Sequence, residues 1–233
     1  MHRATGVLLI VVPLLLLAAL HASVINAQPP AHSGNIAGFF HELVGEWIGS
    51  YTQYNGKTKA PTKYFHAVVK ELSPDAYASV FEYYRIDPKT HKPAEAGVSR
   101  MKTSISPDGK AINTITGNGD VLIDNETTSP EKHQFTEILH LASAGELQGE
   151  GTGRIDVRGM PNGKVTNYAS TWTESVGSFR IAQQLKVEFR VLFFAKIFNI
   201  STDCTGSRGS DVMSLINATG KNADHAGATP GHP

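Results

Sequence analysis

The hydrophobic positions change their spacing once along the chain. Over Ile36–Val44 the apolar side chains fall on one helical face, and Gly45 ends this pattern. From Trp47 onward apolar and polar residues alternate, which is the period of strands that bury one face. The pattern predicts one short helix followed by a run of strands.

Turn-forming residues divide the strand region at short intervals. Asn55-Gly56, Pro107-Asp108-Gly109, Gly117-Asn118-Gly119 and Pro161-Asn162-Gly163 each contain a residue that tight turns need. The strands predicted between such turns are Trp47–Tyr54, Lys63–Leu72, Tyr77–Ile86, Val98–Ser106, Ala111–Thr116, Val121–Ile123, His133–Leu141, Leu147–Val157, Val165–Ser175 and Phe179–Phe198. Thr205–Ile216 is expected to add a final strand.

The longest predicted strand ends at Phe198. Leu185 and every second residue up to Ile197 are apolar, and most residues between them are charged. A strand of this length usually curves, as in a closed barrel. Strands joined by short turns pair with their chain neighbours. We therefore predict an all-β fold, an antiparallel up-and-down β-barrel of about nine or ten strands with a short N-terminal helix. A two-sheet sandwich is the alternative.

The N-terminus has the three parts of a secretory signal peptide. His2 and Arg3 form a basic start, the apolar stretch Val7–Leu20 follows, and small and polar residues end at Ala27. The apolar stretch is shorter than the roughly 20 residues of a membrane-spanning helix. An uncleaved anchor is the alternative. We expect a secreted or periplasmic protein with no membrane span in the mature chain.

This interpretation divides the chain into three parts. We expect residues 1–27 to be the signal peptide and residues 34–218 to be one barrel domain. Residues 219–233 are poor in bulky apolar side chains, and we expect them to form a disordered tail.

Charge and cysteine content narrow the possible partners. The chain has 21 Lys and Arg against 21 Asp and Glu, so it lacks the basic excess of nucleic-acid-binding proteins. We therefore expect no nucleic-acid partner. The single cysteine, Cys204, cannot form a disulfide within the chain. We expect it to be a buried side chain, with a reactive thiol or an intermolecular bridge as alternatives.

The sequence Gly45-Glu46-Trp47, directly after the short predicted helix, resembles the start of lipocalins and their calycin relatives. The fatty-acid-binding and nitrobindin-like barrels open similarly. The resemblance implies that Trp47 closes one end of a barrel and stacks on an arginine from a late strand. Arg208 is the best positional match and Arg190 the second, and both roles are structural. Because the chain has neither a Thr-Asp-Tyr-type motif nor a cysteine pair, it is more similar to bacterial lipocalin-like families than to the animal transporters.

The histidines do not form a known metal motif. His41-Glu42 begins a His-Glu-x-x-His pattern, but position 45 is Gly45. His133 and His140 are an odd number of residues apart, so they point to opposite faces of one strand. We expect no metal and no cofactor. In the nitrobindin-like barrels that the chain resembles, a single inward histidine binds a haem. Here that histidine would be His66 or His133.

Motifs for nucleophilic or phosphate chemistry are also missing. The sequence has no Gly-x-Ser-x-Gly elbow. Gly149, Gly151 and Gly153 alternate along a predicted strand with no helix after it, unlike a phosphate-binding loop. We interpret them as positions where the sheet bends or a bulky side chain crosses over.

Polar and aromatic residues in the predicted strands are the candidates for a ligand site, since such sites are apolar pockets with a few placed polar groups. The expected ligand-binding residues are Tyr51, Gln53, His66, Phe81, Tyr83, Arg85, Arg100, Glu137 and Trp172.

Three functions fit this pattern. The first is an exported soluble barrel that binds a small, partly apolar molecule without chemistry. The second is an isomerase or cyclase similar to allene oxide cyclases, with Glu137 as its catalytic residue because it shares a strand face with Phe135 and Leu139. The third is an envelope or interaction protein without a pocket, which would use an outer apolar patch of Leu192, Phe194 and Phe198.

Overall fold

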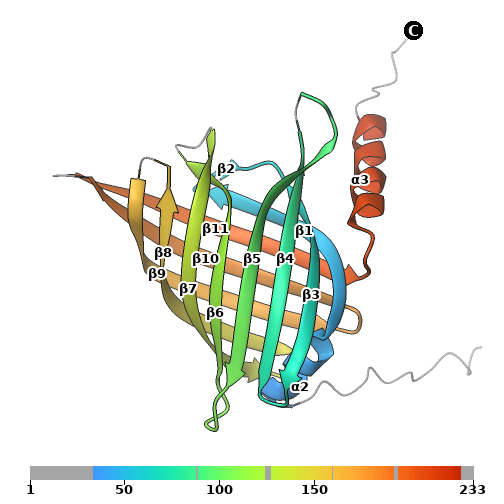
Figure 1. Ribbon diagram of the computed structural model, residues 1–233, viewed down its shortest axis with the longest axis vertical. Coiled ribbons are helices and arrows are strands. Elements are labelled where there is room, and N and C mark those ends of the chain that lie inside the picture. Colours follow the sequence, from blue (N-terminus) through green and yellow to red (C-terminus); the bar gives the residue numbers. More distant parts are fainter. Residues whose placement is uncertain (1–33, 88, 124–126, 159, 192–193, 227–233) are drawn as a thin grey trace, which may run out of the picture. The chain divides into compact units, whose positions relative to one another are not determined.

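Ten antiparallel strands form a closed barrel in the computed structural model of the chain (Figure 1). The structure describes residues 34–226 except 88, 124–126, 159 and 192–193. The expected signal peptide therefore lies outside the described residues. The all-β up-and-down barrel with a short helix before it is confirmed.

Each strand of the barrel pairs with its neighbours in the chain. The helices are α2 (Ile36–Leu43) and α3 (Val212–Ala226). The strands are β1 (Gly45–Asn55), β2 (Thr58–Lys59), β3 (Lys63–Ser73), β4 (Ala76–Ile86), β5 (Pro93–Ile105), β6 (Ala111–Ile123), β7 (Thr127–Ser143), β8 (Glu146–Val157), β9 (Met160–Ser175), β10 (Ser178–Val191) and β11 (Phe194–Arg208).

The first and last strands close the barrel. β1 pairs with β11 in a register that runs from Trp47↔Arg208 to Asn55↔Ile200. The two-residue strand β2 pairs with β1 as an outer addition to the sheet. Closure removes the unpaired edges that an open sheet of this size would expose.

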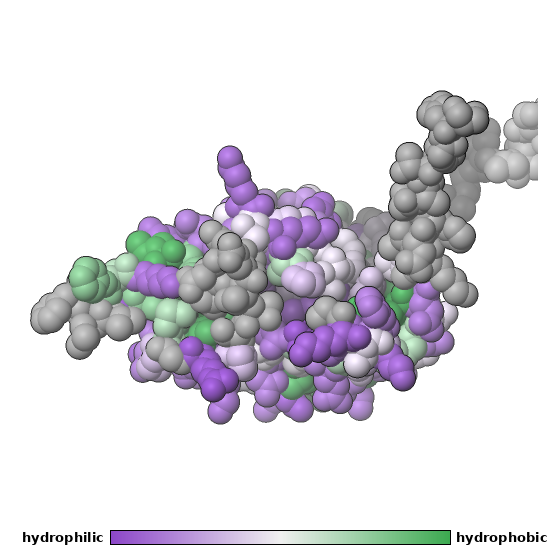
Figure 2. All heavy atoms as spheres, turned by 90° about the horizontal axis from the view of Figure 1, so that it is seen from above, coloured by the Kyte–Doolittle hydropathy of each residue, from purple (hydrophilic) through white to green (hydrophobic). Residues whose placement is uncertain are grey.

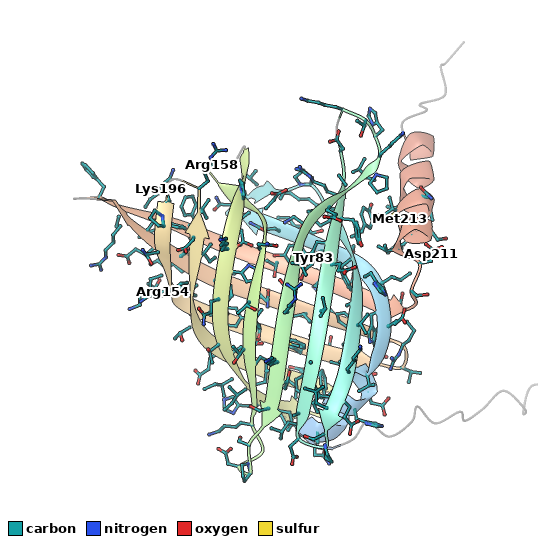
Figure 3. The ribbon with its side chains drawn as sticks, in the orientation of Figure 1. Tyr83, Arg154, Arg158, Lys196, Asp211 and Met213 are labelled. Carbon is teal, nitrogen blue, oxygen red and sulfur yellow. The ribbon has the colours of Figure 1, made fainter. Side chains whose placement is uncertain are left out.

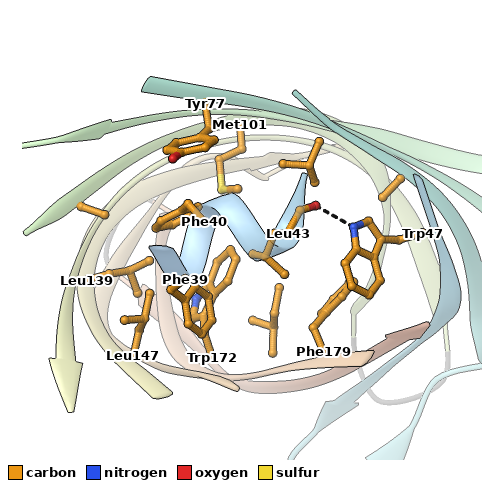
Figure 4. Close-up of a cluster of buried hydrophobic side chains, with 14 of the residues drawn as sticks. Phe39, Phe40, Leu43, Trp47, Tyr77, Met101, Leu139, Leu147, Trp172 and Phe179 are labelled. Atoms are coloured by element: carbon orange, nitrogen blue, oxygen red, sulfur yellow. Dashed lines mark hydrogen bonds between the residues drawn. The ribbon is translucent and has the colours of Figure 1, made fainter. Parts of the chain in front are cut away.

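Helix α2 closes one end of the barrel (Figure 4). The Asn35 side chain caps its N-terminus by accepting a hydrogen bond from the backbone N–H of Gly38 at 2.8 Å. The apolar face of the helix is buried, and Phe40 stacks on Tyr77 with ring centroids 5.5 Å apart. The hydrophobic face predicted from the sequence therefore packs into the barrel end rather than against an outer wall.

Trp47 and Arg208 hold the helix and the closing strands together. The indole of Trp47 is fully buried and donates a hydrogen bond to the Leu43 carbonyl at 2.7 Å. The Arg208 guanidinium lies 4.0 Å from the Trp47 ring centroid and also donates to the carbonyls of Glu42 and Val44. This is the tryptophan–arginine contact that the resemblance implies, with Arg208 and not Arg190 as the partner. Gly45 beside it has a φ of 130°, which L side chains rarely adopt, and a Cβ there would also lie 2.4 Å from Arg208 Nη1.

Two of the predicted turns are strand segments instead. Gly117-Asn118-Gly119 lies inside β6, where it pairs with β5 on one side and β7 on the other. Pro161-Asn162-Gly163 lies inside β9, although Asn162 has the positive φ of 59° that a turn residue adopts. Pairing on both sides of β6 outweighs the local turn preference of its glycines.

The long strand predicted to end at Phe198 is two strands. β10 and β11 form a hairpin that pairs Val191 with Phe194. The buried positions are odd-numbered in β10 and even-numbered in β11, so Phe198 is buried and Ile197 is 48% exposed. The predicted outer patch is therefore wrong for Phe198, whereas Phe194 is 80% exposed. Leu192 lies outside the described residues.

The C-terminal segment is a strand followed by a helix. The strand predicted over Thr205–Ile216 ends at Arg208, and α3 continues past residue 218 to Ala226, so this part of the expected disordered tail is helical. Val212 and Ile216 of α3 pack on Tyr64, on the outer face of β3. Among the described residues, neither helix has the length and apolar character of a membrane span.

The surface at the end opposite α2 is mostly polar. Figure 2 views the molecule from above and shows hydrophobic residues gathered at the left, the side toward which β9–β11 extend in Figure 1. Among the described residues of that hairpin, Phe194 and Ile197 are exposed large apolar residues.

Candidate functional site

The barrel encloses a cavity of about 160 Å³ above the aromatic layer that packs on α2. Its wall combines aromatic and aliphatic side chains with polar groups, a mixture that small-molecule sites use. The aromatic residues that line it are Tyr51, Phe81, Tyr83, Phe135, Tyr168 and Trp172. The polar and charged residues that line it are Gln53, Lys63, Ser99, Asn118, Asp120, Glu131, His133, Gln183 and Thr202.

Five of the predicted ligand-binding residues line this cavity. They are Tyr51, Gln53, Phe81, Tyr83 and Trp172. Tyr51 and Tyr83 lie side by side with ring centroids 5.5 Å apart, and Tyr83 is labelled within the body of the barrel in Figure 3. The structure brings these residues together because each occupies an inward position of its strand.

His66 and Arg100, which were predicted to bind the ligand, do not line this cavity. On β3 the buried positions are Phe65 and Ala67, which turns His66 outward to a 3.3 Å contact with Glu46. On β5 Met101 is buried and Arg100 is exposed. In both strands the residues that face the barrel interior are one position away from the predicted ligand-binding residue.

Arg85 lies in an outer hollow next to the cavity. This hollow shares Asp120 and Glu131 with the cavity wall, and Arg158 at its edge is labelled in Figure 3. Arg85 Nη1 contacts Asp120 Oδ2 at 3.3 Å. Its Nε is buried without a hydrogen-bond partner among the described residues. Arg85 is therefore a residue of the entrance and not of the inner wall.

Glu137 is fully buried but lies behind the cavity wall. Its Oε1 accepts hydrogen bonds from Tyr168 Oη at 3.1 Å, from Trp172 Nε1 at 3.1 Å and from Ser170 Oγ. Its Oε2 accepts from Asn113 Nδ2 at 2.9 Å. Four donors surround this carboxylate, and two of them, Tyr168 and Trp172, line the cavity.

The β8 glycines provide the space for this cluster. A Cβ at Gly149 would lie 2.3 Å from Ser170 Oγ and 2.8 Å from Glu137 Oε1. A Cβ at Gly153 would lie 2.3 Å from the Phe135 ring. The interpretation of these glycines as crossing points for bulky side chains is therefore confirmed.

A second polar group, which the sequence pattern did not predict, lies further along β7, where Glu131 and His133 line the cavity. His133 Nδ1 lies 2.7 Å from Glu131 Oε1, and His133 Nε2 lies 3.1 Å from Ser99 Oγ. The side chains of His133 and Glu131 are only 13% and 10% exposed. The Glu-x-His spacing shows from sequence that the two share a strand face, but Ser99 is on another strand.

The register of three strands explains how Ser99 and His133 meet. Ser99 on β5 pairs with Gly117 on β6, and Gly117 pairs with His133 on β7. Because Gly117 has no side chain, the imidazole can extend across β6, and a Cβ at Gly117 would lie 2.6 Å from His133 Nε2. The Gly-Asn-Gly segment predicted as a turn is thus what permits this contact.

Burial controls the ionisation of several wall groups. It raises the pKa of the phenols of Tyr51 and Tyr83, so both are protonated hydrogen-bond donors at neutral pH. It also raises the pKa of the Cys204 thiol, which disfavours a reactive thiolate. Burial lowers the pKa of Lys63, against the opposing effect of Asp120 and Glu131. The Lys63 ammonium donates to the Asp120 carbonyl.

The described residues do not fit a metal or a haem. No group of three or more His, Cys, Asp or Glu among them is arranged to hold a metal ion. His66 faces outward, and both ring nitrogens of His133 contact other side chains.

Comparisons with known proteins do not assign this chain to a family. The sequence matches no protein-family model and no curated protein. A solved structure, Rv2717c from M. tuberculosis, is similar with a TM-score of 0.46 and 9% sequence identity over 72% of this chain and 93% of that chain. A likeness of this degree carries no argument about function.

Proposed function

We propose that the barrel binds one small, partly apolar molecule in its inner cavity. The observation that carries this proposal is the cavity itself, which aromatic rings surround and which Gln53, Gln183 and Thr202 supply with polar atoms. A barrel filled by its own side chains would have contradicted it.

The cavity volume indicates the size of the ligand. An engineered apolar cavity of about 150 Å³ binds benzene, and this cavity measures about 160 Å³. A molecule with one ring or a short chain therefore fits, whereas a long fatty acid does not. The polar wall groups favour a ligand that also carries an oxygen or nitrogen atom.

The wall offers such a ligand both donors and acceptors. Tyr168 Oη accepts from Gln183 Nε2 at 2.8 Å, and Gln183 Oε1 accepts from Thr202 Oγ1 at 2.9 Å. Gln53 Nε2 is buried without a hydrogen-bond partner among the described residues. A buried donor without a partner costs free energy that a ligand acceptor would recover.

Native mass spectrometry of the purified protein, before and after organic extraction, tests the proposal. We expect a reproducible additional mass that disappears on extraction. A bare chain that also fails to bind phenol, benzyl alcohol and acetophenone would contradict the proposal.

Filling the cavity is expected to weaken binding. Ile115 on β6 lines the cavity, and Ile115→Phe adds volume where the ligand would lie. We expect the affinity for the best of these three probes to fall by about tenfold or more, as measured by titration of tryptophan fluorescence, because Trp172 lines the same cavity. Ile112→Phe is the matched control, since Ile112 is on the same strand but 37% exposed. Equal affinity of the two variants would place the ligand elsewhere.

We also propose that the chain is exported to the periplasm or the medium. The charged start, apolar stretch and small residues of positions 1–27 support this. Expression of the full chain in a bacterial host should yield periplasmic protein whose N-terminal residue is Gln28, as measured by intact mass. A variant without residues 1–27 should stay in the cytoplasm. Full-length protein held in the membrane fraction would favour the uncleaved anchor.

A lipocalin-like ancestry is the family assignment that we propose. The helix-closed barrel end and the contact between Trp47 and Arg208 support it. The isomerase hypothesis receives less support, because Glu137 does not line the cavity and already accepts four hydrogen bonds.

A further inference from the structure

We propose that Ser99, His133 and Glu131 form a nucleophile, base and carboxylate unit that hydrolyses small carboxylic esters. The inference rests on the proposed function, because the ester would occupy the same cavity. All three residues line that cavity. Such units are recognised by geometry and not by sequence order, and here the order along the chain is Ser, Glu, His.

The contacts of the imidazole are those that activate a serine. Glu131 as a carboxylate can only accept, so the neutral His133 ring donates its Nδ1–H to Glu131 at 2.7 Å. Nε2 then carries no proton and accepts from the Ser99 hydroxyl at 3.1 Å. The carboxylate thus selects the tautomer in which the serine faces a base.

Two features of the fold keep this arrangement in place. Glu131 and His133 share the inward face of β7, and Gly117 leaves the space that the imidazole crosses to reach β5. The side chains of His133 and Glu131 are only 13% and 10% exposed, so water competes little for their hydrogen bond. An incidental surface contact between a serine and a histidine would lack this support.

A donor for the developing oxyanion lies next to Ser99. The Tyr83 phenol lines the same cavity from the neighbouring strand β4, and burial raises its pKa, so it keeps its proton. When Ser99 Oγ bonds to a carbonyl carbon, this phenol is the donor that would stabilise the oxyanion of the tetrahedral intermediate.

The reaction balances with water as the second substrate. Ser99 Oγ attacks the ester carbonyl carbon while its proton passes to His133 Nε2. The carbon–oxygen bond to the alcohol breaks, and the leaving oxygen takes that proton, which leaves an acyl-Ser99. Water then gives a proton to Nε2 as its oxygen attacks the acyl carbon. Release of the carboxylic acid returns the proton to Ser99.

The substrate class follows from the cavity. About 160 Å³ admits an ester of one ring with a short acyl group, such as a phenyl acetate. The Tyr83 ring, which stacks on Phe81 and lies 5.5 Å from the Tyr51 ring, favours an aromatic group.

Acylation of a single serine tests the proposal. The purified protein is treated with 4-nitrophenyl acetate and, separately, with a fluorophosphonate, and the modified peptide is identified by mass spectrometry. We expect turnover of the ester and labelling at Ser99. Ser99→Ala should lower the turnover by about 10³-fold and abolish the label. Ser104→Ala, an exposed serine on the same strand, should change neither. Labelling at another residue, or unchanged turnover in Ser99→Ala, would overturn the proposal.

Glu131 acts through His133 and is therefore a positioning residue. Glu131→Gln keeps the shape of the side chain but removes its charge. We expect kcat for 4-nitrophenyl acetate to fall by about 10²-fold while KM stays unchanged, because Glu131 orients the His133 ring and forms no bond to the reacting atoms. A rise in KM together with the fall in kcat, or no change in either constant, would contradict this role.

Binding of acetophenone separates this proposal from the proposed function. Acetophenone has the ring and carbonyl of the substrate class but no ester bond to break. If it binds the wild-type protein and Ser99→Ala with the same affinity while no ester is hydrolysed, the hydrolytic unit is wrong and the binding function stands. If neither acetophenone nor an ester binds, both proposals fail.

Discussion

Replacement of Glu137 by leucine is expected to lower the free energy of unfolding by about 4 kcal/mol. The carboxylate accepts from Asn113, Tyr168, Ser170 and Trp172 in a fully buried position. Leucine has a similar volume but accepts nothing, and each buried donor left without a partner costs about 1–3 kcal/mol. We expect about 1 kcal/mol for each of the four donors, the low end of this range, because some of them can find other partners. Urea denaturation monitored by circular dichroism measures it.

The matched control for this variant is Glu150→Leu. Glu150 is exposed on the neighbouring strand β8, where it pairs with Ile138. Its replacement should change stability by no more than about 0.5 kcal/mol. If Glu137→Leu costs less than about 1 kcal/mol, the four hydrogen bonds do not stabilise the barrel as the geometry indicates.

Replacement of Trp47 by alanine is expected to lower the free energy of unfolding by about 3–5 kcal/mol. The indole is fully buried, packs edge-on against Phe179 at 5.1 Å between ring centroids, and bonds to the Leu43 carbonyl. Its removal also leaves the Arg208 guanidinium without the ring that it covers at 4.0 Å. Thermal and urea unfolding of the purified variant measure the loss.

A double-mutant cycle isolates the contact with the arginine. Trp47→Ala and Arg208→Ala together should cost about 0.5–2 kcal/mol less than the sum of the single changes, which is the coupling expected of a cation–π pair. Phe194→Ala removes an aromatic ring that is 80% exposed and should leave stability within about 0.5 kcal/mol of wild type. Additive single changes would show that Trp47 acts through packing alone.

The architecture of the barrel was readable from local patterns. The alternation that starts at Trp47, and turn residues such as Asn55-Gly56, predicted strands that pair with their chain neighbours. The helical face of Ile36–Val44 predicted α2 within one residue. These features are local because the period of a buried strand face and the φ requirements of a turn depend on a few adjacent residues.

Local patterns failed where tertiary pairing had the larger effect. The hairpin between β10 and β11 has no Gly, Asn or Pro at residues 191–194, so the alternation ran through it and the phase of β11 was wrong. Gly117-Asn118-Gly119 has the composition of a turn, but pairing with β5 and β7 keeps it in a strand. The error at the hairpin moved the predicted side chains of β11 to the opposite face, because strand faces have a period of two.

The candidate site, like the fold, was predicted only in part from the sequence. The sequence alone determined the strand-forming segments, the closing tryptophan and the set of aromatic residues from which the cavity draws Tyr51, Phe81 and Tyr83. Only the tertiary structure decided that His66 and Arg100 face outward and that Glu137 lies behind the wall. It also decided that Ser99 meets His133, since that contact depends on the register of three strands whose hydrogen bonds no single segment specifies.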